Sequence, residues 1–294
     1  MELLNNDRLL VDSGNQFDLT TYDTNYNPGI KTKKHAEKLL KRANKVIYQE
    51  QRKLYAADNH SVLCVFQAMD AAGKDSTIRH VFSGVNPAGF QVSSFKAPSN
   101  KELDHDFLWR CNQAIPSRGM IGLFNRSHYE EVLVCKVHPG YVLGQNIPGV
   151  KTLEDINEEF WLQRYESIRN WENHLARNGT IILKFFLNVG QDEQKRRFLS
   201  RIEEDKKNWK FNIGDLKERA LWPQYMQAYQ DAIENTSSNQ APWYIIPADD
   251  KPIMRAVVAN IVAEKLQSLQ LKFPTVTAND QEDMLAAKKI LQNE

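Results

Sequence analysis

SVLCVFQAMDAAGKDST, which runs from Ser61 to Thr77, is the stretch of this chain that says most about its fold. It begins as an apolar run with β-branched side chains, which predicts a buried strand, and the helix-like IRHVFSG follows it. Between them lies a loop of small residues that ends in Gly73 and Lys74. Such a loop binds phosphate, because its N–H groups and the helix N-terminus point at the anion and lysine adds a positive charge.

The loop departs from the pattern GxxxxGK[ST] at two positions. Ala68 stands where the first glycine is expected, and Asp75 stands where the hydroxyl residue is expected. A strand-to-helix turn that merely contains a lysine is therefore the alternative. We expect Lys74 to act on the reacting phosphates. The remaining predicted phosphate or nucleotide contacts of the loop are Ala72, Gly73, Asp75, Ser76 and Thr77.

Asp70 is an unusual residue inside a phosphate loop. A carboxylate beside phosphate is repelled unless a metal ion or a proton lies between them. A bridging Mg²⁺ is the simplest explanation, so we predict Asp70 to be a catalytic residue and the metal ligand. The alternative is that its side chain caps the following helix.

Apolar runs rich in β-branched and aromatic residues recur along the chain with helical patterns between them. The five runs are SVLCVFQ from Ser61, FQVSSF from Phe90, MIGLFN from Met120, TIILKFFLNV from Thr180 and PWYIIPA from Pro242. Strands that alternate with helices and are apolar throughout predict an α/β fold whose central five-stranded parallel sheet is flanked by helices on both faces. The clearest helix spans about Glu154–Arg177. The charged segment at about 191–238 exceeds what one crossover needs, and we interpret it as a helical lid.

The rest of the chain divides into three parts. Residues 1–58 are predicted to form an N-terminal arm and a helix, which begins at about His35. Residues 59–275 are predicted to form the core with its lid, and 276–294 a polar tail with one short helix at about Met284–Leu291.

Composition restricts the classes of function. With 41% hydrophobic residues the chain can bury a sizeable core, and 38 Lys and Arg against 37 Asp and Glu give a net charge of +1. That balance favours neither nucleic acid nor an anionic membrane as a partner. Three widely spaced cysteines fit neither a disulfide framework nor a paired-cysteine zinc site. No apolar run reaches the ~20 residues of a membrane span and no signal peptide is readable, so we expect a cytoplasmic protein.

The loop QAMDAAGKDS resembles that of polyphosphate kinase family 2. Further motifs extend the resemblance over about residues 35–270: SGVNPAGFQVSSFKAPS from Ser83, FNRSHYEEVLV from Phe124, DEQKRRFLSRIEEDKKNWKF from Asp192, LWPQYMQAYQDAI from Leu221 and APWYIIPADDK from Ala241. The resemblance implies a thymidylate-kinase-like P-loop kinase fold and Mg²⁺ as cofactor. It also implies phosphoryl transfer between inorganic polyphosphate and nucleotides (ADP, AMP and ATP), in a homo-oligomer.

MIGLFNRSHYEE resembles the family's Walker B strand, which commonly ends in Asp-Arg, whereas this one ends in Asn125 and Arg126. Asparagine offers a metal only a neutral carbonyl oxygen. In the family, Asn at this place together with Glu130 is typical of the class III subgroup, which accepts nucleoside mono- and diphosphates. Arg126 lies where α/β folds contact ligands, and its planar fork suits phosphate. The alternative for Arg126 is a structural ion pair with Glu130 or Glu131.

Basic residues of the lid are the predicted contacts to polyphosphate, since the family's lid carries basic residues at matching positions. They are Lys195, Arg196, Arg197, Arg201 and Lys206. The alternative is a solvated helix face in which Glu193 pairs with Arg197, and Arg201 with Asp205, each pair contributing ~0.3 to 0.5 kcal/mol. Against it, Arg197 and Arg201 share one face, and like charges four residues apart are unfavourable without an anion between them.

The sequence thus predicts a Mg²⁺-dependent enzyme that transfers phosphoryl groups from polyphosphate to ADP and AMP, with GDP and GMP as further candidate acceptors. Two alternatives stay open. An ATP-dependent nucleoside or nucleotide kinase would share the loop and the fold. A nucleotide-binding regulatory module without turnover would fit the missing glycine and Asn125.

Overall fold

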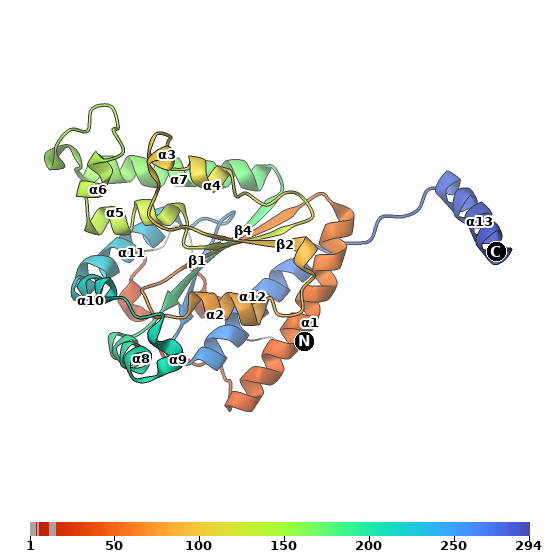
Figure 1. The fold of residues 1–294 in the computed structure, drawn as a ribbon, viewed down its shortest axis with the longest axis horizontal. Helices are drawn as coiled ribbons and strands as arrows, with labels where there is room; N and C mark the ends of the chain where they lie inside the picture. Colours follow the sequence, from red (N-terminus) through yellow and green to blue (C-terminus); the bar gives the residue numbers. More distant parts are fainter. Residues whose placement is uncertain (1–3, 5, 12–15) are drawn as a thin grey trace.

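The computed structural model describes residue 4, residues 6–11 and residues 16–294, so part of the predicted N-terminal arm (1–3, 5 and 12–15) lies outside the described residues. The described residues form a five-stranded parallel sheet in the order β2-β3-β1-β4-β5 (Figure 1). The strands are β1 Ser61–Gln67, β2 Phe90–Ser94, β3 Ile121–Asn125, β4 Thr180–Asn188 and β5 Trp243–Pro247. The predicted α/β fold with a parallel sheet is confirmed.

Strand β1 lies at the centre of the sheet and is buried along its whole length. Its residue Val62 is in register with Ile121 of β3 on one side and with Ile181 of β4 on the other. From β1 the chain builds β2 and β3 on one side and then crosses to build β4 and β5 on the other. Ligands of open α/β sheets bind at the carboxyl ends of strands where the strand order switches direction, and the end of β1 is such a point.

Helices cover both faces of the sheet (Figure 1). On one face α12 (Lys251–Ser268) lies against β4 and β5, and α1 (Lys33–Ala57) and α2 (Lys74–Val81) pack on it. Every residue of α12 from 256 to 263 is buried, because this helix is enclosed between the sheet and α1. On the other face α7 (Glu158–Arg177) packs on β4, and α11 (Trp222–Thr236) packs on α7.

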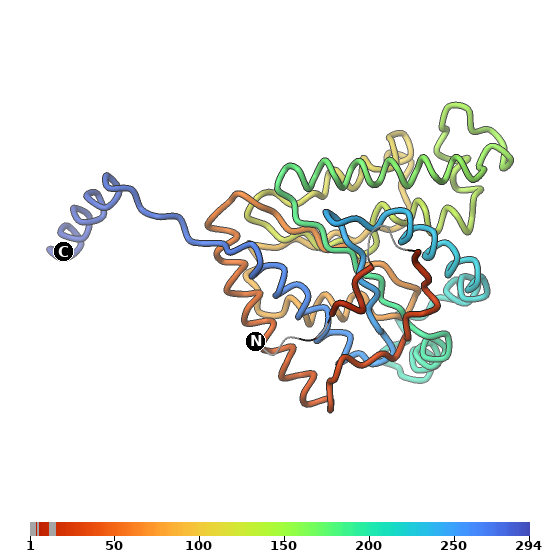
Figure 2. Tube along the Cα trace, turned by 180° about the vertical axis from the view of Figure 1, so that it is seen from behind, coloured from red at the N-terminus to blue at the C-terminus, as the bar shows by residue number. Residues whose placement is uncertain are grey.

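The shorter elements complete the chain. They are η1 Asp7–Leu9, η2 Leu19–Thr21, η3 Pro87–Gly89, α3 Asn100–Leu103, α4 Trp109–Asn112, η4 His128–Glu131, α5 Val134–Val137, α6 Gly140–Leu143, η5 Leu153–Asp155, α8 Gln191–Glu203, α9 Asp205–Asn208, α10 Ile213–Ala220 and α13 Ala278–Gln292. Within the arm, Leu10 forms an antiparallel bridge to Tyr244 at the outer edge of β5. Figure 2 shows the arm, in red, passing across this side of the body.

The predicted lid segment has two kinds of structure. Helices α8, α9 and α10 lie together at one end of the sheet (Figure 1). Helix α11 instead buries Tyr225, Tyr229 and Ile233 and belongs to the layer that covers the sheet. The predicted domain boundaries stay a prediction. None of the helices in the described part of the chain has the length and apolarity of a membrane span.

Candidate active site

The phosphate loop connects β1 to α2 and turns sharply at two residues. Ala71 has φ +62° and Gly73 has φ +114°, so both lie in the left-handed region. A Cβ on Gly73 would come within 3.3 Å of the Met254 side chain, and its φ would be strained for any L side chain. The backbone conformation of Gly73 therefore sets the turn from the loop into α2. After this turn the first N–H groups of the helix face the space beyond the end of β1.

Lys74 lies at the first position of α2 and reaches back over the loop. Its Nζ donates to the Ala68 carbonyl at 2.7 Å, and no ion pair to a described carboxylate holds it. Burial lowers the pKa of Lys74, and the nearby Arg126 guanidinium lowers it further. The ammonium thus has a single carbonyl as its hydrogen-bond acceptor, which it can exchange for a phosphate oxygen.

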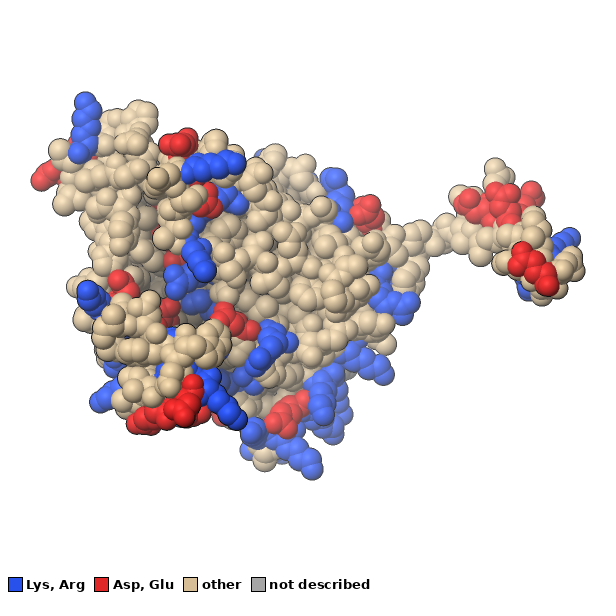
Figure 3. Space-filling view, viewed as in Figure 1, with Lys and Arg blue, Asp and Glu red and all other residues tan. Residues whose placement is uncertain are grey.

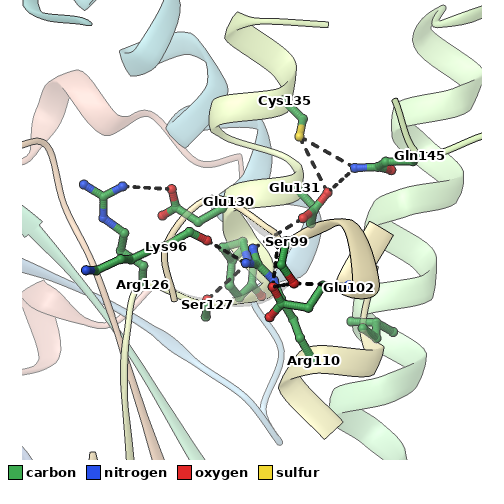
Figure 4. A network of polar contacts seen from close by, with 12 residues as sticks. Lys96, Ser99, Glu102, Arg110, Arg126, Ser127, Glu130, Glu131, Cys135 and Gln145 are labelled. Atoms are coloured by element: carbon green, nitrogen blue, oxygen red, sulfur yellow. Dashed lines mark hydrogen bonds and ion pairs between the residues drawn. The ribbon is translucent and has the colours of Figure 1, made fainter. Parts of the chain in front are cut away.

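Arg126 follows β3 with φ +63° and is held between two carboxylates. Its Nη2 lies 3.0 Å from Asp70 Oδ1. Its Nη1 lies 3.6 Å from Glu130 Oε2 (Figure 4). Burial raises the pKa of Glu130, and the Arg126 charge opposes that rise. The alternative pairing of Arg126 with Glu130 is thus present, but the guanidinium also borders the cleft, so it is available to a phosphate.

Asp70 points into the cleft. It does not cap α2, because the N-cap of this helix is Gly73 and no side chain bonds there.

Glu131, the neighbour of Glu130 in sequence, turns away from the site. Figure 4 shows it with Arg110 and Gln145, and it also pairs with Arg164 at 3.1 Å. The structure thus separates neighbouring acids, since Glu130 faces Arg126 while Glu131 lies in a buried structural network.

Asn125 connects the end of β3 to the first turn of α2. Its Nδ2 donates to Asp75 Oδ1 at 2.6 Å. An aspartate at position 125 would place a second carboxylate against Asp75, which is unfavourable without a cation between them. The neutral amide therefore joins the two elements.

The hydroxyl residues of the loop turn toward the backbone. Ser76 Oγ and Thr77 Oγ1 each donate to the Gly73 carbonyl at 3.0 Å. Ser76 still borders the cleft, whereas Thr77 and Ala72 are buried and lie outside its lining. Gly73 and Asp75 complete the part of the loop that faces the cleft.

A cleft of about 990 Å³ opens in front of the loop. It carries nine Lys and Arg side chains against four Asp and Glu. The nine are Lys74, Lys96, Arg126, Arg196, Arg197, Arg201, Lys207, Lys210 and Lys251. Basic side chains gather in the hollow between the lid helices and the body (Figure 3). A chain with a net charge of only +1 therefore concentrates positive charge in one place, which attracts a polyanion.

Three of the five lid residues predicted to contact polyphosphate line this cleft, namely Arg196, Arg197 and Arg201. Lys195 and Lys206 are exposed and outside the lining, so the structure does not bring them to the site.

Sequence reasoning missed Lys96 and Lys251 as lining residues. Each follows the carboxyl end of a strand, Lys96 after β2 and Lys251 after β5. That position was the signal that could have identified them.

Arg197 has a different environment from the other lid cations, because its side chain is 5% exposed. Its Nε donates to Glu193, its Nη1 to the carbonyls of Ala71 and Ala72, and its Nη2 to two further backbone carbonyls, those of residues 248 and 249. All five N–H donors of the guanidinium are thus satisfied by protein acceptors. Gln194 adds a bond to the Asp70 carbonyl at 2.9 Å. The start of α8 is therefore fastened to the phosphate loop.

Three other lid cations pair with acids within the lid. Arg196 and Lys207 bond Glu193 and Glu204, both at 2.6 Å. Arg201 pairs with Asp215 of α10 at 3.0 Å rather than with Asp205. The pairs of Arg196 and Lys207 are at the surface, where they contribute little to stability and can exchange partners, whereas the Arg201 pair is partly buried.

Lys251, at the first position of α12, has no ion pair with any described carboxylate. Partial burial lowers the pKa of its ammonium to about 8, and the neighbouring Arg197 charge adds to the effect. A bound anion would offset the repulsion between the Lys251 and Arg197 charges and would favour the charged form of the lysine.

A metal ion at this site would depend on bound phosphate. No group of three or more His, Cys, Asp or Glu side chains within the described residues could hold a metal by itself. Mg²⁺ is commonly bound by one or two carboxylates together with substrate phosphates. Asp70, in the cleft beside Lys74, fits that requirement.

A central strand that ends in a phosphate loop, a lysine at the helix start and a basic cleft are the features of a phosphoryl-transfer enzyme. The family model "Polyphosphate kinase 2 (PPK2)" matches residues 30–274, and the chain belongs to this family.

Relatives agree with this assignment over nearly the full chain. An ADP-polyphosphate phosphotransferase of Rhodopseudomonas palustris is 47% identical over 96% of both chains. An AMP/ADP-polyphosphate phosphotransferase of Meiothermus ruber is 42% identical over 90% of this chain and 94% of the relative. The crystal structure of polyphosphate kinase 2 from Arthrobacter aurescens superposes with a TM-score of 0.87 at 35% identity, covering 98% of this chain and 99% of that one. The predicted fold and family are therefore confirmed.

Proposed function

We propose that this protein transfers phosphoryl groups between inorganic polyphosphate and ADP, with Mg²⁺ as the metal. The observation that supports this most directly is the cleft, whose nine cations extend from Lys74 well beyond the phosphate loop. One nucleotide tail needs few of these charges, whereas a polyphosphate chain can contact many at once. The names of the two relatives describe the same reaction class.

The chemistry asks the protein for alignment and charge neutralisation more than for covalent steps. The N–H groups at the start of α2 and Lys74 would hold the reacting phosphates, with Lys74 leaving the Ala68 carbonyl for a phosphate oxygen. Arg126 would stabilise charge that develops during transfer, while Asp70 and Glu130 fix its guanidinium beforehand. Mg²⁺, held by Asp70 and phosphate oxygens, would neutralise charge on the phosphates.

The lid would hold the rest of the donor chain. Arg196, Arg201 and Lys207 border the cleft and would exchange their carboxylate partners for phosphate, and Lys210, which also borders the cleft, would join them. For Arg197 we now propose support of the phosphate loop in place of contact with polyphosphate, because its donors are all engaged. Closure of α8–α10 would exclude water and limit hydrolysis.

We further propose AMP as a second acceptor. Asn125, which donates to Asp75, leaves the end of β3 without an additional negative charge. This favours AMP as an acceptor, because its single phosphate binds Mg²⁺ less well than the diphosphate of ADP. The Meiothermus ruber relative is named for both acceptors. ADP formation from AMP and polyphosphate tests this, and absence of any product contradicts it. Asn125→Asp should lower the ratio of the AMP rate to the ADP rate, and an unchanged ratio removes Asn125 as the cause.

One assay separates the proposed activity from its alternatives. Purified protein receives ADP, Mg²⁺ and polyphosphate with no other nucleotide, and ATP is measured. An ATP-dependent kinase or a regulatory module forms no ATP under these conditions. Lys74→Ala is the matched control, because a contaminating enzyme would keep its activity in that preparation. A cytoplasmic location and a homo-oligomeric state are also proposed, on the family resemblance.

A further inference from the structure

Gln67 is a polar side chain in an otherwise apolar, buried stretch. It is the last residue of β1, the central strand, and it is fully buried. Ala68, whose carbonyl accepts from Lys74, follows it directly. A buried amide is costly unless both its oxygen and its nitrogen find hydrogen-bond partners. The partners of Gln67 therefore indicate what this side chain does.

The orientation of the Gln67 amide follows from its neighbours. With its oxygen toward Ser127, the amide accepts from the Ser127 N–H and the Ser127 hydroxyl, both at 3.1 Å, and its nitrogen donates to Glu130 Oε1 at 2.9 Å. The opposite orientation would place the amide oxygen against the Glu130 carboxylate, so that two acceptors would face each other. We therefore assign the first orientation, in which both ends of the amide are bonded.

These bonds hold both ends of the short turn that follows Arg126. Ser127 is the N-cap of η4, and Glu130 lies within this turn. The same strand end fixes the Arg126 backbone, because the Arg126 N–H donates to the Phe66 carbonyl at 3.1 Å. Arg126 has φ +63°, a conformation that is unfavourable for a residue other than glycine and that persists only where its surroundings determine it. The end of β1 therefore helps to hold Arg126 in this conformation.

The Glu130 carboxylate depends on Gln67 for its hydrogen bond. Its second oxygen, Oε2, lies 3.6 Å from Arg126 Nη1, which is an ion pair beyond hydrogen-bond distance (Figure 4). Among the residues that the structure describes, Gln67 is the one hydrogen-bond donor to this carboxylate. Loss of the amide would therefore leave a largely buried carboxylate with an ion pair alone.

Charges around Glu130 act in both directions. Burial raises its pKa, whereas the charges of Arg126 and Lys74 and the hydrogen bond from Gln67 lower it, and the Asp70 charge raises it. The other titratable groups that face this carboxyl are neutral: Tyr225 and Tyr229 of α11 and Cys135 of α5. The Gln67 amide thus favours the ionised form of Glu130, which is the form that attracts Arg126.

We propose that Gln67 is a positioning residue for phosphoryl transfer, whose amide holds the Glu130 carboxylate toward Arg126 and so fixes the guanidinium at the cleft. The other carboxylate beside the guanidinium, Asp70, is the proposed metal ligand, so Glu130 is the acid that stays with Arg126 throughout. Gln67 itself touches no substrate, because it is buried and outside the cleft lining. This inference rests on the proposed function for its activity assay.

Gln67→Met tests the proposal, because methionine has a similar length and no hydrogen-bond donor. We expect kcat with ADP and long-chain polyphosphate to fall by ~10-fold while the KM for ADP changes little, since one hydrogen bond to a charged group is lost. Gln67→Asn, whose amide stops one methylene short, should show the same fall if the methionine variant does not fold. A folded variant with the parent kcat would overturn the proposal.

Gln145→Met is the matched control. Gln145 donates to the neighbouring acid Glu131 at 2.6 Å, in the network that turns away from the site. This variant also takes an amide from a glutamate, so it should lower the melting temperature and keep the parent kcat. An equal fall of kcat in the Gln67 and Gln145 variants would reduce Gln67 to a structural role and overturn the proposal.

A pH profile separates positioning from stability. Ionised Glu130 holds Arg126, so its contribution to kcat is present above the pKa of this carboxyl and is lost as pH falls through it. Without the amide donor that pKa should rise, and the acid limb of kcat should move to higher pH. Glu130→Gln lacks the titrating group, so adding Gln67→Met to it should not move the limb. An unmoved limb in Gln67→Met, or the same shift in the Glu130→Gln background, would overturn the proposal.

NMR titration of the Glu130 carboxyl carbon, without substrates, makes the same comparison without turnover. Gln67→Met should titrate at higher pH than the parent, and Gln145→Met should titrate with the parent. If the parent lacks polyphosphate activity but the titration shifts in this way, the proposed function fails and the contact between Gln67 and Glu130 stands. Identical titrations of the parent and Gln67→Met would overturn the inference whatever the activity.

Discussion

The two sides of the cleft hold their cations in different ways. On the loop side, Lys74 is partly buried and the Arg126 side chain is 40% exposed, and the two are oriented by a loop carbonyl and by two carboxylates respectively. On the lid side, Arg196 and Lys207 have side chains that are 69% and 45% exposed and pair with acids of their own helices. Preorganised charges in an enclosed site stabilise a transition state strongly, whereas exposed charges are screened by salt beyond about 8 Å at ~0.15 M.

We infer a division of work from this difference. Loop-side residues should determine the rate of transfer, and lid-side residues should determine the affinity for the polyphosphate chain. Arg197 breaks the pattern, because it belongs to the lid in sequence and to the loop in its contacts. The variants below test the division in order of expected effect.

Lys74→Ala should have the largest effect. It removes the cation at the reacting phosphates without disturbing the core, so we expect kcat to fall by ~10²-fold or more with an unchanged melting temperature. Lys195→Ala, an exposed lysine of α8 outside the cleft lining, is the control and should keep the parent rate. A Lys74 variant with more than about a tenth of the parent rate would contradict the loop-side assignment.

Asp70→Asn should come next, because it removes charge at nearly constant shape. We expect kcat to fall by ~10-fold or more and the Mg²⁺ concentration for half-maximal activity to rise, while ADP affinity changes little. Glu130 still holds Arg126 in this variant. Titration of activity with Mg²⁺ and equilibrium binding of ADP measure the two quantities. An unaltered Mg²⁺ dependence with normal turnover would exclude Asp70 as the metal ligand.

Arg197 and Arg201 sharpen the comparison, since they lie one helical turn apart, and the first is 5% exposed and bonded to the phosphate loop while the second is 19% exposed and pairs with Asp215 of the lid. Arg197→Ala would remove the guanidinium from four backbone carbonyls at the loop and from Glu193, and we expect a loss of ~3–5 kcal/mol in the free energy of unfolding. Arg201→Ala should keep the stability and raise the KM for polyphosphate several-fold, more strongly at low salt. Thermal unfolding and salt-dependent kinetics check both. Equal effects of the two changes on polyphosphate KM, with equal stability, would contradict the proposed roles.

The fold and the phosphate loop were predictable from sequence because their signals are local. Continuous apolar runs mark the strands, and the residues of the loop are neighbours in the chain. The role of Arg197 was not predictable from sequence, because the carbonyls that accept its hydrogen bonds belong to residues 71–72 and 248–249, which are far apart in the chain. The pairing of Arg197 with Glu193, which the i,i+4 spacing offered as the alternative to polyphosphate contact, is present. The same spacing led to Asp205 as the partner of Arg201, whereas the tertiary fold brings Asp215 there.

The smallest expected effect concerns Lys251, a cleft lysine that is half-buried and unpaired among the described residues. Its pKa of about 8 reflects burial and the charges of Arg197, Arg255 and Lys207, opposed by Glu193. Below pH 8 the ammonium is charged and should attract polyphosphate. Above pH 8 it loses its proton, so affinity should fall.

We therefore expect the KM for polyphosphate to rise by roughly threefold between pH 7 and pH 9 through this group, as one partly exposed charge contact allows. Lys251→Arg keeps its charge over the whole range and should flatten the profile at the low-pH affinity. Lys251→Ala should flatten it at the weaker affinity, and Lys195→Ala should retain the parent slope. If the arginine variant shows the same rise as the parent, then another group titrates, and Lys251 does not contact the donor chain.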